Sequence, residues 1–206
     1  MRKTPGTGRT SRRKNEQDAK AHAVWKAKVL APALAARIGS TPATRFRGNP
    51  DVFGRLVEDH DRHRALIAMI EDTDGKSPVR EKLFRELVRE VKSHAAAEEQ
   101  ALWSTVMRNP DTTDDARHAV AEHKQLDDML ADLAARDMAT PAWTKRFAKM
   151  KEKYLHHIRE EEQEQFVAAE KHLGSADKRH MRTVFSRRKT AEKAHTKIKK
   201  KIKLKD

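Results

Sequence analysis

Four histidines and two glutamates stand at spacings that suit metal chemistry. Each histidine interrupts an apolar stripe with three-and-four spacing near the middle of a predicted helix. The four are His60, His94, His123 and His157. Two of them are followed four residues later by a glutamate, Glu98 in one helix and Glu161 in the other. Residues i and i+4 share one helix face, so each of these glutamates lies on the same stripe as its histidine.

The ordinary interpretation of one such histidine is a hydrogen-bonded core residue, and a His-x-x-x-Glu pair is ordinarily a solvated pair worth about 0.3 kcal/mol. Four imidazoles and two carboxylates at one depth are different, because burying them without partners costs several kcal/mol. A shared metal site removes that cost. Two bridging carboxylates and four terminal nitrogen donors match the carboxylate-bridged di-iron arrangement of helical bundles. Six protein ligands leave positions open for an oxo or hydroxo bridge and for a small diatomic molecule.

The last helix offers two pairs with the required spacing, His156 with Glu160 and His157 with Glu161. Only the second pair continues the apolar stripe of this helix, whereas His156 shares a face with charged residues. A large aromatic residue also stands nine positions after His94 (Trp103) and nine after His157. The periodicity therefore favours His157 and Glu161.

Helices must position these groups, and proline-containing start signals divide the chain accordingly. Asn49-Pro50-Asp51, Ser77-Pro78, Asn109-Pro110 and Thr140-Pro141 each open a periodic segment. The segments end near 72, 107, 137 and 173. Four long helices with short connections predict an all-α fold, an up-down-up-down four-helix bundle over residues 50–173.

Composition agrees with this fold class and excludes several functions. One Tyr, seven Gly and seven Pro in 206 residues are too few for a β-sandwich or barrel. The absence of Cys excludes disulfides, Cys-ligated zinc, ordinary iron–sulfur clusters and thiol catalysis. No P-loop, GxGxxG or Ser/His/Asp set supports an NTPase, Rossmann or hydrolase function.

The net charge of +14 belongs to the two ends of the chain. Residues 1–22 carry seven Lys or Arg against two acidic residues, and residues 178–206 carry thirteen against two. We expect 1–49 to be a basic, partly disordered N-terminal extension, with a helix within 15–38 that lies against the bundle through Trp25 and Leu30. The Lys/Arg-rich tail 174–206 has helical propensity from Ser175 onward but little apolar surface, and we expect it to fray or to dock only on a partner.

The polybasic segment 178–206 has three open interpretations. It can bind nucleic acid without base selectivity by counterion release, it can touch an anionic membrane surface through Ile198, Ile202 and Leu204, or it can be a solubilising tail. No stretch approaches the roughly 20 apolar residues of a transmembrane helix. We therefore expect a cytoplasmic protein without a cleaved signal.

The ordered motifs resemble the hemerythrin-like, HHE cation-binding domain family over about residues 50–172. They are Glu58-Asp59-His60, His94-x-x-x-Glu98-Glu99, Glu122-His123 and His157-x-x-x-Glu161-Glu162. The resemblance implies a four-helix bundle with a non-haem, oxo-bridged di-iron centre that binds dioxygen or nitric oxide. It implies His60, His94, Glu98, His123, His157 and Glu161 as iron ligands, the two glutamates bridging.

The chain departs from the oxygen-carrier members of that family. Asp127 stands where they have a second histidine, and the His157–Glu161 spacing is four where theirs is five, to an aspartate. The sequence thus resembles the broader HHE group, which includes proteins that repair iron centres or handle nitric oxide. The interpretation that follows is a di-iron protein that binds or senses dioxygen or nitric oxide, and a binding protein rather than an enzyme. The alternative is a nucleic-acid-associated, iron-binding protective protein. His63 and Asp127 lie near the stripes as interior hydrogen-bonded residues or extra ligands.

Overall fold

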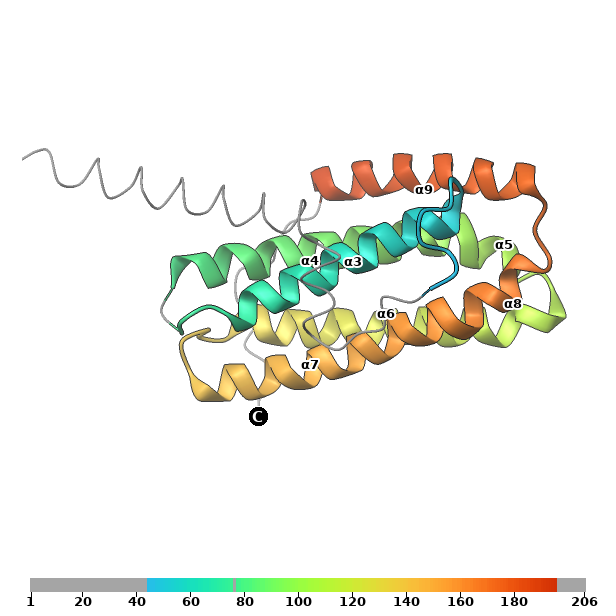
Figure 1. Cartoon of the computed structure of the whole chain (residues 1–206). Helices are drawn as coiled ribbons and strands as arrows, with labels where there is room; N and C mark the ends of the chain where they lie inside the picture. Colours follow the sequence, from blue (N-terminus) through green and yellow to red (C-terminus); the bar gives the residue numbers. More distant parts are fainter. Residues whose placement is uncertain (1–43, 76, 196–206) are drawn as a thin grey trace, which may run out of the picture.

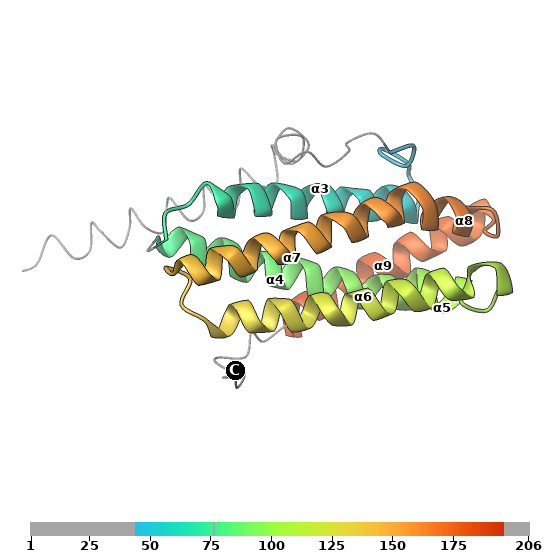
Figure 2. The same cartoon turned by 90° about the horizontal axis from the view of Figure 1, so that it is seen from below.

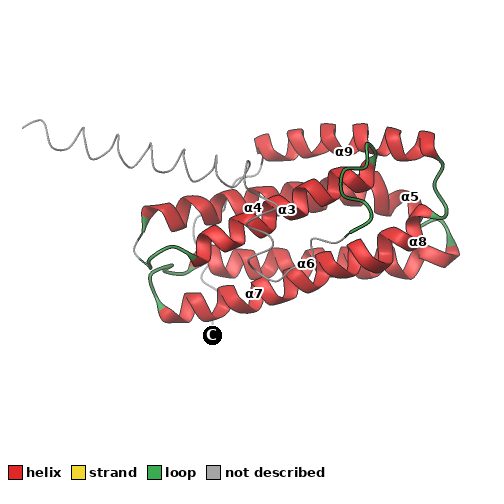
Figure 3. Ribbon diagram, in the orientation of Figure 1, coloured by secondary structure: helices red, strands yellow, loops and turns green. Residues whose placement is uncertain are grey.

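A computed structural model describes residues 44–75 and 77–195, and this part of the chain is all-helical (Figures 1 and 3). The helices lie side by side as a bundle, with short loops at alternate ends (Figures 1 and 2). In chain order the elements are α3 (Val52–Glu71), α4 (Pro78–Glu98), η1 (Glu99–Trp103), α5 (Ser104–Val106), α6 (Pro110–Ala135), α7 (Pro141–Glu160), η2 (Glu161–Gln165), α8 (Phe166–Glu170) and α9 (Ser175–His195).

The helix starts follow the predicted signals. Asp51, Ser77, Asn109 and Thr140 are the N-caps of α3, α4, α6 and α7, and each side chain accepts a hydrogen bond from a backbone N–H of the first turn. Proline stands at the first position of α4, α6 and α7, where no backbone N–H is needed.

Two apolar clusters fill the bundle, one toward each end. The first surrounds Leu87 and Trp143, and the second surrounds Phe53, Trp103 and Phe166. The six predicted ligands belong to neither cluster and stand between them along the helices. Apolar packing on both sides limits the access of water to this middle layer, which strengthens the electrostatic interactions within it.

The residues just before α3 already belong to the packed core. Phe46 is fully buried, and its ring centroid lies 4.9 Å from that of Phe53. Arg47 donates two hydrogen bonds to the Asp61 carboxylate, at 3.0 and 2.8 Å. The last residues of the expected N-terminal extension 1–49 therefore pack as part of the bundle. The helix predicted within 15–38 lies outside the described residues.

The expectation that the chain from 175 onward frays or waits for a partner is wrong for residues 175–195. They form α9, which packs against α3 and α4 (Figure 1). Met181, Phe185 and Lys189 are spaced by four and are the buried residues of this helix. The sequence did not predict that this helix packs on the bundle, because one buried position is a lysine, whose charge is neutralised by acidic residues of α3 and α4. Residues 196–206 lie outside the described part.

Two π-helical segments interrupt the long helices at the same depth in the bundle. η1 follows α4 directly at Glu99, and η2 follows α7 directly at Glu161. A π-helical turn holds one residue more than an α-helical turn and is frequent at functional sites. The extra residue changes which side chains face inward, so the neighbours Glu161 and Glu162 are both buried.

Replacing Phe185 by alanine tests whether α9 is part of the fold. Phe185 is fully buried against the second apolar cluster, so Phe185→Ala should lower the free energy of unfolding by about 3–5 kcal/mol. The exposed neighbour Arg187 is the matched control, and Arg187→Ala should change stability by less than about 0.5 kcal/mol. Urea unfolding of the full chain measures both, and equal stabilities would contradict the packing of α9.

Candidate metal centre

The structure brings all six predicted residues together in the middle of the bundle. His60 comes from α3, His94 and Glu98 from α4, and His123 from α6. His157 is near the end of α7, and Glu161 is the first residue of η2. Every one of them is buried, with at most 7 % of its surface exposed.

One half of the cluster consists of His60, His94 and Glu161. The Nε2 atoms of the two imidazoles lie 3.2 Å apart, and His60 Nε2 lies 3.4 Å from Glu161 Oε2. One donor atom from each of the three residues falls within 4.8 Å of the others, a separation that one metal ion can bridge.

The other half consists of His123, His157 and the same glutamate. Glu161 Oε1 lies 3.4 Å from His157 Nε2 and 3.8 Å from His123 Nε2. These three donors also fall within 4.8 Å of one another. The two oxygens of Glu161 thus face two different pairs of histidines, as a bridging carboxylate does.

Glu98 occupies the corresponding position on the opposite helix. Its Oε2 lies 3.5 Å from His94 Nε2 and 3.4 Å from His123 Nε2, so it too stands between the two halves. Both Glu98 oxygens, both Glu161 oxygens and His123 Nε2 are buried without a hydrogen-bond partner among the described residues. Buried carboxylate oxygens without donors are costly, and cations coordinated at this point would remove that cost. The donor set fits metal ions.

The outer nitrogen of each histidine meets a carboxylate. His60 Nδ1 lies 2.8 Å from Glu162 and His94 Nδ1 lies 3.3 Å from Asp59. The other two distances are both 2.9 Å, from His123 Nδ1 to Glu99 and from His157 Nδ1 to Glu122. Such contacts fix the tautomer in which Nε2 carries the free lone pair and raise its basicity as a ligand.

Sequence reasoning did not assign these four carboxylates, although a signal was present. Asp59 and Glu122 each precede a histidine of the site, and Glu99 and Glu162 each follow one of its glutamates. Neighbours of inward-facing residues normally point elsewhere on an α-helix. Here the π-helical segments turn Glu99 and Glu162 back toward the centre.

The structure also separates the two candidate pairs of the last helix. His157 and Glu161 are buried, whereas the His156 side chain is 65 % exposed. His63 is buried beside the centre and its Nδ1 lies 2.6 Å from the Tyr154 hydroxyl. Asp127 instead pairs with Lys92 at the surface.

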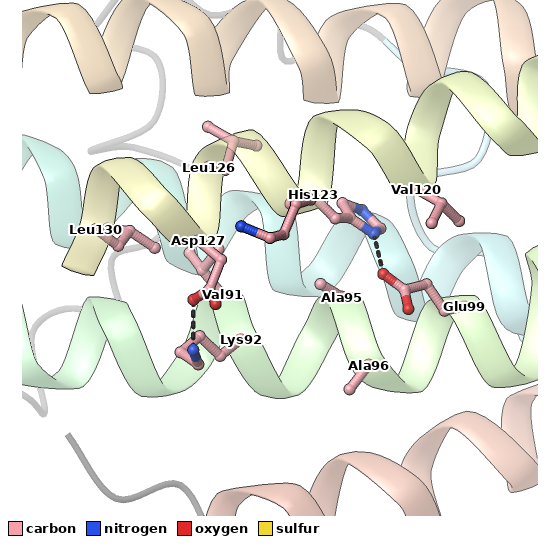
Figure 4. A pocket seen from close by; sticks show the side chains of 11 residues that line it. Val91, Lys92, Ala95, Ala96, Glu99, Val120, His123, Leu126, Asp127 and Leu130 are labelled. Atoms are coloured by element: carbon pink, nitrogen blue, oxygen red, sulfur yellow. Dashed lines mark hydrogen bonds and ion pairs between the residues drawn. The ribbon is translucent and has the colours of Figure 1, made fainter. Parts of the chain in front are cut away.

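A groove between α4 and α6 reaches the His123 side of the centre (Figure 4). Its volume is about 350 Å³, and its lining is mostly apolar with small residues, Ala95 and Ala96, on the α4 wall. The imidazole of His123 and its partner Glu99 lie at one end, and the Lys92–Asp127 ion pair lies at the other (Figure 4). The groove reaches His123 from the surface and is therefore a candidate route for small ligands to the cluster.

The hemerythrin HHE cation-binding domain model matches residues 51–169, more than half of the chain. The chain belongs to this family. The resemblance predicted from the motifs is therefore confirmed, and membership implies cation binding, typically of iron. No curated protein and no solved structure gives a match. No helix in the described ranges has the length and apolarity to cross a membrane.

The match to the HHE domain ends before α9, yet α9 reaches the cluster of six predicted residues. Lys189 of α9 is buried between Asp59 and Glu90, and its Nζ lies 2.8 Å from Glu90 Oε2. Asp59 in turn contacts His94. The Phe185 ring lies edge-on to the His94 imidazole, at 5.6 Å between centroids. This helix therefore completes the environment of one histidine of the HHE cluster.

The charges of the cluster depend on burial and on one another. Burial raises the pKa of Glu161, and the negative charge of Glu98 raises it further. Burial by itself would lower the pKa of His123, but the carboxylates of Glu98 and Glu99 raise it to about 9. Burial lowers the pKa of His157 to about 4 in spite of its contact with Glu122. At neutral pH the metal-free cluster therefore holds a proton on His123, while His157 is neutral.

Metal uptake by the metal-free protein should release a proton at pH 7, because a cation displaces the one on His123. Affinity should rise with pH and level off above about 9, where His123 is already deprotonated. Anaerobic Fe²⁺ titration calorimetry in two buffers of different ionisation enthalpy measures the proton count. An uptake that releases no proton at pH 7 would contradict this charge assignment.

Proposed function

We propose that the HHE domain of this chain holds an oxo- or hydroxo-bridged non-haem di-iron centre and binds or senses dioxygen or nitric oxide. The observation that carries the proposal is Glu161, whose two oxygens face two separate histidine pairs. One iron would take His60 and His94, the other His123 and His157, and Glu98 and Glu161 would bridge them. Iron supplies open coordination positions at which a diatomic molecule binds.

The protein's own contribution is to hold the donors and to exclude water. Four carboxylates orient the imidazoles, and two apolar clusters close the layer above and below. The groove at His123 has a volume of about 350 Å³ and a mostly apolar lining. That apolar lining suits the approach of a small gas such as dioxygen or nitric oxide. We also propose an up-down-up-down order for the four long helices and a cytoplasmic location.

The basic C-terminal segment does not enter this proposal. Within the described part, four of the seven Lys and Arg residues in 178–195 contact acidic residues outside α9. Lys178 contacts Glu170, Arg182 contacts Glu58, and Lys193 contacts Glu90. These ion pairs account for much of the charge of residues 178–195 without a nucleic-acid partner.

Single substitutions at the centre should separate the two metal positions. The protein purified after expression with iron should hold about two iron ions per chain, as a carboxylate-bridged pair requires. Because Glu161 is shared, Glu161→Ala should lose both, whereas His60→Ala and His157→Ala should each weaken one position first. Elemental analysis and the near-ultraviolet absorption of the oxo bridge measure this loss.

The control is Glu164→Gln, which changes an exposed glutamate of η2 and should keep the full iron content. One iron per chain in the unmodified protein would contradict a dinuclear centre. Zinc without iron would contradict the proposed gas chemistry.

Filling the groove should slow access of small ligands to the centre. Ala95 is part of the α4 wall beside His123 and coordinates nothing (Figure 4), so Ala95→Leu should lower the rate of nitric oxide or azide binding and leave iron content unchanged. Stopped-flow absorption measures the rate. Ala142→Leu, at an exposed position near the start of α7, is the control, and equal rates in both variants would contradict this route.

A further inference from the structure

A second group of histidines and glutamates lies outside the central cluster, where α6 and α7 meet. His118 and Glu122 stand four residues apart on α6, and His156 and Glu160 stand four residues apart on α7. His118 Nε2 lies 3.6 Å from Glu122 Oε2 and 3.7 Å from Glu160 Oε1. His156 Nε2 lies 3.5 Å from the other oxygen of Glu160.

These separations suit one cation. Ligands about 2.0–2.1 Å from a tetrahedral zinc ion lie roughly 3.3 Å from one another, and one donor atom each from His118, Glu122 and Glu160 falls within 4.8 Å of the others. The side chain of His118 is 53 % exposed and that of Glu122 only 6 %. The group thus opens to solvent on one side and is anchored on the other.

The matching place on the other half of the bundle carries fixed cations instead. There Arg55 stands four residues before Asp59, and both Arg55 and Lys189 of α9 contact that carboxylate. On α6 a histidine, His118, takes the position corresponding to Arg55, and α7 adds a further carboxylate, Glu160. Lys153 contacts one oxygen of Glu122, which leaves the other oxygen facing His118.

We propose that His118, Glu122 and Glu160 form a second, solvent-facing site for a divalent transition-metal ion, with zinc as the best-suited occupant. Two carboxylates and one imidazole provide three donors, and the open side leaves a position for water or for His156. The ion would tie α6 to α7. It would also hold Glu122 in place, and the same Glu122 oxygen lies 2.9 Å from His157 Nδ1 of the central cluster.

The test uses the full chain with iron in its central cluster and Zn²⁺ alone as the probe. Titration calorimetry should show one Zn²⁺ per chain, and the melting temperature should rise with Zn²⁺ concentration because the ion binds the folded state. His118→Ala and Glu160→Gln should each weaken Zn²⁺ binding at least about tenfold, since a three-donor site loses one donor. Both variants should keep their central iron.

The matched control is His180→Ala, which removes an exposed imidazole from α9 and should leave Zn²⁺ binding unchanged. Equal Zn²⁺ affinity in the unmodified chain and in His118→Ala would overturn the proposal. The same titration on Glu161→Ala separates this site from the di-iron proposal. In Glu161→Ala, Zn²⁺ should still bind at His118, Glu122 and Glu160, even though the central cluster holds no metal.

Discussion

The structure depends on two carboxylates buried in the middle of a helical bundle without a hydrogen-bond donor. Glu98 and Glu161 are fully buried, and within the described residues neither accepts a hydrogen bond. Packing alone cannot compensate for such a placement, because a buried carboxylate needs positive charge or donors. The surrounding imidazoles supply it only in part, since burial keeps His157 neutral. This point of the fold therefore favours bound cations.

Charge alternates outward from that point. The carboxylates meet imidazoles, the imidazoles meet a second set of carboxylates, and these meet basic residues such as Arg64, Lys153 and Lys189. Burial by itself would raise the pKa of Asp59, yet His94, Lys189 and Arg55 hold it well below its usual range. The outer carboxylates orient the imidazoles, and the basic residues keep those carboxylates charged.

The sequence predicted the helix starts and the inward face of each helix, because capping residues and apolar periodicity are local signals. It also favoured His157 over His156, and the burial of the two agrees. It did not predict the π-helical segments, which arise where one extra residue is accommodated between fixed packing partners. The place of α9 was missed for a different reason. In a sequence pattern a lysine indicates a surface position. Lys189 is buried because Asp59 and Glu90, which are distant in the sequence, neutralise its charge.

The helix pairs on either side of residue 109 are related as two copies of one hairpin. His123 stands 63 residues after His60, and the same offset relates His94 to His157 and Glu98 to Glu161. The contacts at Nδ1 show the same symmetry. Asp59 and Glu122 each contact a histidine on the next helix of their own hairpin. Glu99 and Glu162 each contact a histidine of the opposite hairpin.

The cluster therefore lies on an approximate twofold axis, which would make two bound metals equivalent. α9 breaks that equivalence, because it has no counterpart on α6 and α7 among the described residues. Lys189 contacts Asp59, the partner of His94, and Phe185 packs against His94, so both lie on the half of the cluster that contains His94. A symmetric bundle with one asymmetric helix would hold two metal ions that differ in electronic environment while sharing one ligand set.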